Sequence, residues 1–226
     1  MNITFVTQGS LDELIGHLNK LRAPDVLLLA EGVLPELDLL KEAEGESGFV
    51  VRLCALSEQL ECAIVAGCDT LVCDILHKSA VVVDRGRLLG VSDMANVLDE
   101  TGYYSGGGFR VYDTPAGKLG VIVGEDLFFP EVARILTLCD AEVLLCPFGK
   151  ISSPMPQVMM RAAAFSNGVN VCMAAAGCVQ IADLKGEMIA LPTAMLEFNM
   201  EIIKDFHLIS ARRRGCYREI YSAFEC

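Results

Sequence analysis

The sequence predicts an α/β fold in which two mixed sheets pack face to face and helices cover their outer surfaces. Of the 226 residues, 53% are hydrophobic and 21% are charged, and the mean hydropathy is +0.44. Such an apolar composition indicates strands that are buried on both faces. Some apolar runs alternate with helical patterns, as in crossovers, and others follow one another through short turns, as in hairpins. Residues 1–226 fit a single domain.

The first part of the chain alternates strands and helices. Residues 2–7 form an apolar strand, and Ser10 and Glu13 then match a capping box that begins a helix reaching about residue 21. Residues 25–31 form a second strand that ends at a carboxylate. Residues 48–60 carry apolar side chains at helical spacing. This order predicts crossover connections.

The next part predicts hairpins. Residues 62–66 form a strand, and residues 71–75 and 79–84 have the composition of two neighbouring strands. Residues 85–87, Arg-Gly-Arg, form a turn, after which the apolar pattern resumes at residues 88–90. Strands joined this closely pair antiparallel.

A glycine-rich loop at residues 101–108 leads to a strand at 109–112 and a turn at 114–117. The stretch GKLGVIVGEDLFFPE follows, which has the pattern of a buried strand that passes through a sharp turn into a helix. That helix covers residues 130–138, with Pro130 at the first helical position, where proline is favoured.

The last part supplies further strands and one helix. The helix covers residues 156–166. The strands are expected at residues 142–146, 169–174, 179–183 and 187–191, the last two as a pair.

Charge and hydropathy exclude several classes of partner. The formal net charge is -12, whereas nucleic-acid binding needs clustered cations, so we expect no nucleic-acid partner. No apolar run approaches the roughly 18 residues of a membrane span, and the first residues lack the pattern of a signal peptide. We therefore expect a cytoplasmic protein with no membrane partner.

The ten cysteines form no Cys-x-x-Cys pair, and most lie in apolar runs, so we expect reduced thiols that act as small core residues. The three histidines, His17, His77 and His207, share no motif. The sequence thus predicts no cofactor and no metal site.

Eight local segments occur in a particular order: DVLLLAEG, HKSAVVVDRGRLLG, ETGYYSGG, FRVYDTPAGKLGVIV, FFPEVARIL, AEVLLCP, RAAAFSNGVNV and AAAG. In order and spacing they resemble the carbon-nitrogen hydrolase superfamily of nitrilases and aliphatic or N-carbamoyl amidases, over nearly the whole chain. The resemblance implies a four-layer αββα sandwich.

Members of that superfamily use a cysteine nucleophile, a glutamate base, a lysine that stabilises the tetrahedral intermediate, and commonly a second glutamate. The resemblance places Glu31 at the base, Glu100 at the second glutamate and Met94 at the lysine. Gly124, six residues before Pro130, falls at the nucleophile. The Glu-Lys-Cys triad is therefore degenerate.

These substitutions remove chemistry that the reaction needs. Glycine offers no nucleophile, and methionine carries no charge to stabilise an oxyanion. We therefore predict a protein that does not hydrolyse amides through a thiol but binds a small molecule, such as an amide or amine, or assembles with a partner. With Glu125 and Asp126 beside Glu31 and no lysine, we expect an acidic pocket.

Two catalytic alternatives remain open. One is an amide hydrolase with a relocated thiol, for which Cys146 is the candidate. The other uses carboxylates among Glu31, Glu100, Glu125 and Asp126 to activate water, directly or through Mg²⁺, Mn²⁺ or Ca²⁺. The further pocket candidates are Glu125, Asp126, Tyr103 and Cys146.

Assembly is also implied by the resemblance. The superfamily pairs subunits through helices that correspond to residues 130–138 and 156–166, and the second of these is unusually rich in Met, Ala and Phe. We expect a homodimer. The segment SAVVVDRGRLLGV also resembles glutaminase domains that feed ammonia to a synthetase, which implies a protein partner as an alternative.

Overall fold

Two β-sheets form the centre of the molecule in the computed structural model, which describes residues 1–16, 23–98 and 102–217. The first sheet has the order β13-β1-β2-β4-β5-β6, with β3 paired to β4, and the second has the order β12-β11-β10-β9-β8-β7. The strands are β1 Asn2–Val6, β2 Val26–Leu29, β3 Leu37–Asp38, β4 Ala63–Val72, β5 Ile75–Asp84, β6 Arg87–Asp93, β7 Val111–Thr114, β8 Gly117–Val121, β9 Val143–Pro147, β10 Asn170–Ala175, β11 Cys178–Ala182, β12 Met188–Pro192 and β13 Met195–Asn199.

Both sheets are mixed, as predicted. In the first, β1, β2 and β4 are parallel, while β5, β6 and β13 run antiparallel to their neighbours. In the second, β8, β9 and β10 are parallel, while β7, β11 and β12 are antiparallel to theirs. Crossovers and hairpins thus coexist in each sheet.

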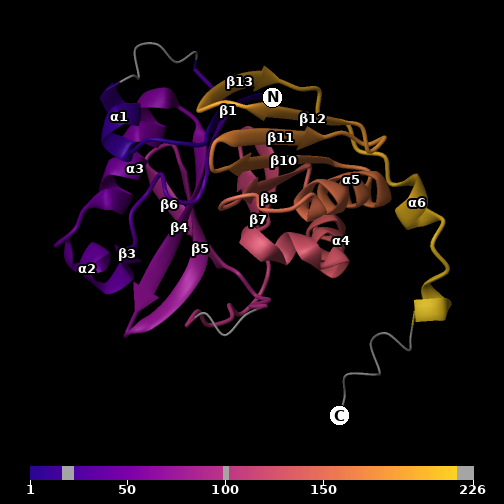
Figure 1. Ribbon diagram of the computed structural model, residues 1–226, viewed down its shortest axis with the longest axis horizontal. Coiled ribbons are helices and arrows are strands. Elements are labelled where there is room, and N and C mark those ends of the chain that lie inside the picture. Colours follow the sequence, from indigo (N-terminus) through magenta and orange to yellow (C-terminus); the bar gives the residue numbers. More distant parts are fainter. Residues whose placement is uncertain (17–22, 99–101, 218–226) are drawn as a thin grey trace.

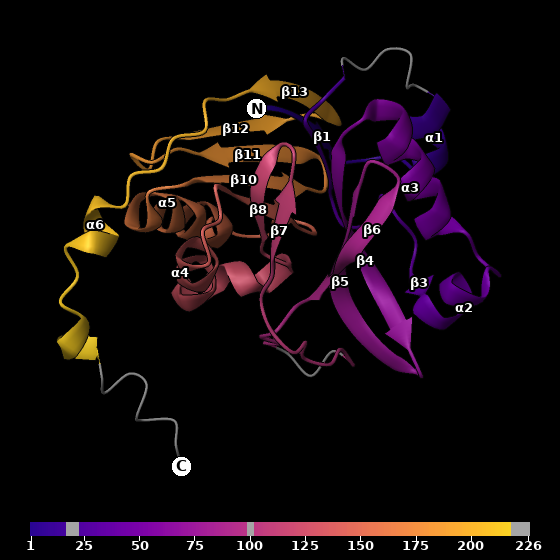
Figure 2. The same ribbon diagram turned by 180° about the vertical axis from the view of Figure 1, so that it is seen from behind.

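Helices cover the two outer faces (Figure 1). Helices α1 (Leu11–Gly16) and α3 (Phe49–Leu60) lie on the first sheet, and α4 (Pro130–Leu138) and α5 (Met155–Asn167) lie on the second. Figure 2 shows the same layers from behind. The predicted four-layer αββα sandwich is confirmed.

Side-chain alternation along the second sheet explains the layers. Val143 and Leu145 of β9 join the core shared with the first sheet. Leu144 and Cys146 point the other way and pack in a second core with residues of α4 and α5. A strand buried on both faces needs apolar residues at every position, which is the continuous pattern in its sequence.

The predicted helices are present, and their local signals are visible as contacts. Ser10 N donates to Glu13 Oε2 and Glu13 N donates to Ser10 Oγ, both at 3.3 Å, which forms the predicted capping box. Pro130 begins α4. The predicted end of the first helix, near residue 21, lies outside the described residues.

One predicted strand is wrong. Residues 71–75 are the tip of a single hairpin, in which β4 extends to Val72 and β5 begins at Ile75. The turn between them consists of Cys73 and Asp74, with φ values of 51° and 64°. Neither residue is a glycine, so the turn had no strong sequence signal.

Several elements were not predicted. They are the short strand β3, the edge strand β13 and helices α2 (Leu39–Glu44) and α6 (His207–Ser210), together with the 3₁₀ turns η2 (Gly124–Phe128) and η3 (Arg214–Tyr217). No helix in the described part of the chain has the length and apolar character needed to cross a membrane.

Candidate functional site

A cavity of about 230 Å³ lies where the carboxyl ends of β2, β8 and β9 meet. The two sheets are joined beside it, because Glu31 N donates to Phe148 O at 3.4 Å. Ligands of α/β proteins commonly bind at such strand ends. The lining residues are Glu31, Lys78, Met94, Val97, Leu98, Tyr103, Gly124, Glu125, Phe148, Gly149 and Lys150.

Gly124 lies at the turn between β8 and α4, with a φ of +50° that L side chains rarely adopt. A Cβ atom built on Gly124 would lie 3.1 Å from Glu31 Oε1 and 3.5 Å from Met94 Sδ. Residues 31, 94 and 124, which are far apart in the sequence, therefore meet at one point.

The cavity contains a cation that the sequence reasoning missed. Lys78 Nζ lies 3.1 Å from Glu31 Oε2 and 3.5 Å from Asp69 Oδ1, and 4.8 Å from the centre of the Tyr103 ring. Met94 N donates to Lys78 O at 2.7 Å, so the lysine is beside the residue that the resemblance aligns with the superfamily's lysine. The expectation of an acidic pocket without a lysine is wrong.

Two further contacts hold Lys78 in place. Lys78 and Asp69 are directly opposite each other in the β4–β5 ladder. Tyr103 donates its hydroxyl to Asp69 Oδ2 at 3.0 Å, so Tyr103 lines the cavity as predicted and also fixes the carboxylate that faces the lysine. Lys78 lies just before the predicted strand at residues 79–84. Its spacing of two and four residues from Ala80 and Val82 places the three side chains on one face of the strand, and this was the available signal that the lysine faces inward.

Glycines enclose the Glu31 side chain. A Cβ on Gly149 would lie 2.9 Å from Glu31 Oε2, and a Cβ on Gly67 would lie 3.1 Å from Glu31 Cγ. The side chain thus occupies space that only glycine neighbours leave open. Movement of the Glu31 side chain is limited by the close approach of these two glycines and by its ion pair with Lys78.

The charges of this pair are coupled. Burial raises the pKa of Glu31 above its ordinary value of 4.5, while Lys78 opposes this rise and Asp69 and Glu125 add to it. Burial alone would lower the pKa of Lys78, but Glu31 and Asp69 raise it, so the lysine stays protonated.

Asp126 was predicted to line the pocket and does not. Its buried carboxylate accepts hydrogen bonds from Ala95 N at 2.9 Å, Asn96 N at 2.8 Å and Asn96 Nδ2 at 2.7 Å. Burial raises the pKa of Asp126 despite these bonds. The neighbouring Glu125 does line the cavity. Asp126 instead fixes the loop that follows Met94.

Cys146 also lies away from the cavity. It is fully buried on β9, on the face that packs against α4 and α5. Burial, together with the charges of Glu31 and Asp126, raises the pKa of Cys146 well above its ordinary value. The thiol is therefore protonated and inaccessible. Because the thiolate is the form that acts as a nucleophile, Cys146 is not available for catalysis. The predicted second glutamate, Glu100, lies outside the described residues.

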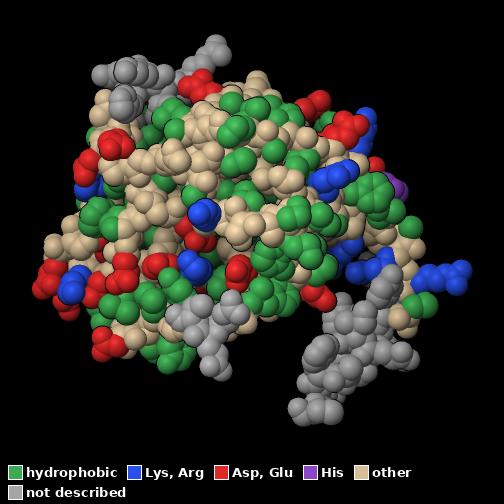
Figure 3. All heavy atoms as spheres, viewed as in Figure 1, with side chains coloured by type: hydrophobic (Ala, Val, Ile, Leu, Met, Phe, Trp, Pro, Cys, Tyr) green, Lys and Arg blue, Asp and Glu red, His purple; other side chains and the backbone are tan. Residues whose placement is uncertain are grey.

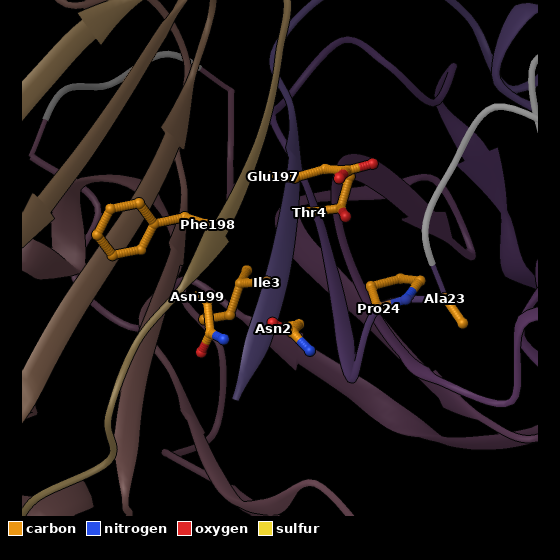
Figure 4. A pocket seen from close by; sticks show the side chains of 8 residues that line it. All are labelled: Asn2, Ile3, Thr4, Ala23, Pro24, Glu197, Phe198 and Asn199. Carbon is orange, nitrogen blue, oxygen red and sulfur yellow. The ribbon is translucent and has the colours of Figure 1, made fainter.

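Within the described ranges, no group of three or more His, Cys, Asp or Glu side chains is arranged to hold a metal ion. A larger cavity, of about 530 Å³, lies along β1 and β13 (Figure 4). The Phe198 ring points away from the other side chains, and Glu197 is the only charged lining residue in the described part of the chain. The residues that the resemblance singled out, Glu31, Met94 and Gly124, line the smaller cavity, so we assign function to the Glu31 cavity.

The αββα sandwich, with a glutamate facing a strand-to-helix turn, defines a nitrilase-like protein. The chain belongs to the carbon-nitrogen hydrolase family, whose model matches residues 22–207. It is similar in fold to Nit3 of Saccharomyces cerevisiae, a member of the nitrilase superfamily, with a TM-score of 0.77, 16% identity and coverage of 96% of both chains. A carbon-nitrogen hydrolase from Helicobacter pylori gives a TM-score of 0.74, 18% identity and 98% coverage of both.

Among curated proteins, the chain is 38% identical over 86 residues to a citrullinase of Francisella tularensis, covering 34% of this chain and 30% of that protein. It is 36% identical over 99 residues to a nitrilase of Pyrococcus abyssi, covering 42% and 38%. An N-carbamoylputrescine amidase of Arabidopsis thaliana is 34% identical over 89 residues, covering 36% and 30%. The matched segments thus span well under half of these relatives.

Proposed function

We propose that this protein binds a small amide or amine in the Glu31 cavity and does not cleave it through a thiol. The observation that carries the proposal is the position of Gly124, where an added Cβ atom would lie 3.1 Å from Glu31 Oε1 and 3.5 Å from Met94 Sδ. Where a nucleophile and an adjacent base would have to meet, there is a base and no side chain for it to activate.

The cavity supplies groups that suit an amide. Lys78 has N–H donors for a carbonyl oxygen, and the Glu31 carboxylate accepts from an amide N–H₂. Both side chains are largely buried, at 27% and 15% exposure for Lys78 and Glu31, so hydrogen bonds to a ligand would be shielded from water.

The names of similar proteins support this ligand class. They include a citrullinase and N-carbamoylputrescine amidases, which are named for compounds with amide-type carbon-nitrogen bonds. One solved structure of the amidase from Nesterenkonia sp. AN1 records acrylamide added to its active-site cysteine. The present chain has glycine at the turn that faces its glutamate.

A second candidate function is hydrolysis by a carboxylate-activated water. It is favoured by one observation: Glu31 and Glu125 line the same cavity, and the charge of Glu125 raises the pKa of Glu31. Two carboxyl groups that share a cavity can act as a general acid and a general base.

The test combines binding and turnover. Isothermal titration of propanamide, acetamide and butylamine into the wild-type protein should show binding, and Glu31→Gln should weaken it about tenfold through loss of a charge-assisted hydrogen bond. Ammonia release should stay at background. Turnover that survives iodoacetamide but is lost in Glu31→Gln would establish the water mechanism, and absence of binding would refute the proposal.

We also propose that the protein is a homodimer that pairs through α4 and α5, as an alternative or addition to assembly with another protein. Hydrophobic side chains gather on this face (Figure 3), among them the exposed Ile135, Leu138, Val158 and Phe165. Light scattering should give twice the chain mass, and Phe165→Ser should lower it. A monomer at micromolar concentration would refute this.

A further inference from the structure

A second cavity adjoins the Glu31 cavity. The second cavity has a volume of about 430 Å³ and shares four lining residues with the first: Leu98, Glu125, Phe148 and Lys150. The shared lining residues place an inner chamber at Glu31 next to an outer chamber against the start of α5. A ligand that fills the inner chamber therefore extends toward the outer one.

The two chambers differ in chemistry. The inner one has Glu31, Lys78 and Tyr103. The outer one is lined by Phe128, Phe148, Met155 and Met159, with the two phenyl rings edge to face at 6.3 Å. Met155 is 57% exposed, so the chamber presents apolar surface to water.

The junction between the chambers carries opposite charges. Glu125 and Lys150 line both chambers. In the described part of the chain, no side-chain hydrogen bond or ion pair joins either of them to another residue. Lys150 is exposed, so its charge stays hydrated while its aliphatic stem borders the chain of a ligand. In the inner chamber Lys78 is already paired with Glu31 and Asp69. Because these charges already have partners, the chamber favours a ligand whose polar head group is uncharged.

Building on the proposed function, we propose that the ligand is amphipathic: an uncharged amide head at Glu31 and Lys78, and an aliphatic chain that passes Glu125 and Lys150 to cover Phe128, Phe148 and Met159. Burial of apolar surface supplies the affinity for the chain, and the inner hydrogen bonds set its orientation.

The experiment compares chain lengths by isothermal titration of the full chain. Each methylene that enters the outer chamber should lower Kd about threefold, so hexanamide should bind roughly 30-fold more tightly than propanamide. Met159→Ser and Met155→Ser should each weaken hexanamide by about threefold to tenfold and leave propanamide unchanged. Val158→Ser is the matched control, because Val158 is exposed on the same helix but lines neither chamber.

The outcomes separate this inference from the one on which it rests. Equal affinities for propanamide and hexanamide would refute the two-chamber ligand and leave the amide site intact. Binding of neither amide would refute both. If Met155→Ser halves the mass in light scattering while the affinity for hexanamide is unchanged, a second copy of the chain covers the outer chamber, and the inference is wrong.

Discussion

Lys78 Nζ lies 3.1 Å from Glu31 Oε2, although the two residues are 47 positions apart and Glu31 lies in the turn after β2 while Lys78 lies on β5. The lysine belongs to β5, and Met94, which directly follows the neighbouring strand β6, donates its N–H to the lysine's carbonyl oxygen. The glutamate that the resemblance aligns with the superfamily's base is therefore paired with a lysine of β5, and its carboxylate already has a partner before any ligand binds.

Replacing Lys78 should make stability depend more strongly on pH. The folded pKa of Glu31 lies above 4.5, so the folded state holds the proton more tightly than the unfolded chain, and stability falls as pH rises from about 4.5. Lys78→Met raises that pKa further and should cost about 2 kcal/mol or more at pH 8, and less at pH 5. Urea unfolding at both pH values measures this.

Two controls define the cause of that effect. Lys185→Met removes an exposed lysine outside the cavity and should leave the pH dependence unchanged. Adding Glu31→Gln to Lys78→Met should abolish the extra dependence. If the double variant keeps it, another group is titrating.

A side chain at residue 124 should lower the free energy of unfolding by more than the unfavourable backbone conformation alone explains. Gly124→Ala should lose about 1 to 2 kcal/mol for its positive φ, plus the cost of the 3.1 Å approach to Glu31. Gly45→Ala is the matched control, since Gly45 has a φ of +78° and open space around it. Equal losses in denaturant unfolding would mean that Glu31 moves freely.

Adding one of the superfamily's catalytic groups should not produce hydrolysis. Gly124→Cys alone lacks the oxyanion stabiliser at residue 94, and Met94→Lys alone has no nucleophile, so neither should release ammonia from amides, nitriles or carbamoyl amines. The double variant should give trace turnover. Full activity of Gly124→Cys would show that Lys78 already serves as the stabilising cation.

Iodoacetamide should distinguish buried from exposed thiols. Cys73 and Cys139 are exposed and should react in the native protein at pH 8, whereas Cys146 should react only after unfolding. Cys172, whose pKa burial raises to about 12, is an internal reference. Rapid native labelling of Cys146 by mass spectrometry would revive the relocated thiol.

Asp126→Asn should destabilise the protein by about 1 to 3 kcal/mol, because three N–H donors converge on a carboxylate and an amide cannot accept from all of them. Asp113→Asn, at an exposed position of β7, is the control and should change stability little. A loss no larger than that of the control would mean that water replaces the lost acceptor.

The fold was largely predictable because its helices have local signals. The capping box at Ser10 and the proline at residue 130 mark helix starts within a few residues of sequence. Strand β13 has no such signal, because it is defined by its pairing with β1 at the other end of the chain. Long-range pairing of this kind leaves no local pattern.

The site was predictable only in part, for a similar reason. Glu31 and Gly124 occupy positions within recognisable segments, and the structure brings them together. Lys78 was missed because its partner is distant in sequence. Asp126 was misplaced because consecutive residues of a turn point in different directions, so Glu125 faces the cavity while Asp126 faces the loop after Met94.

The positive φ at Gly124 has a consequence for how this sequence can change over time. Any L residue there lowers stability, so selection for folding alone retains the glycine once no side chain is required. A lineage that acquired a nucleophile at this position would first pass through less stable variants. Such a change is therefore disfavoured by the backbone itself, independently of any demand on the ligand.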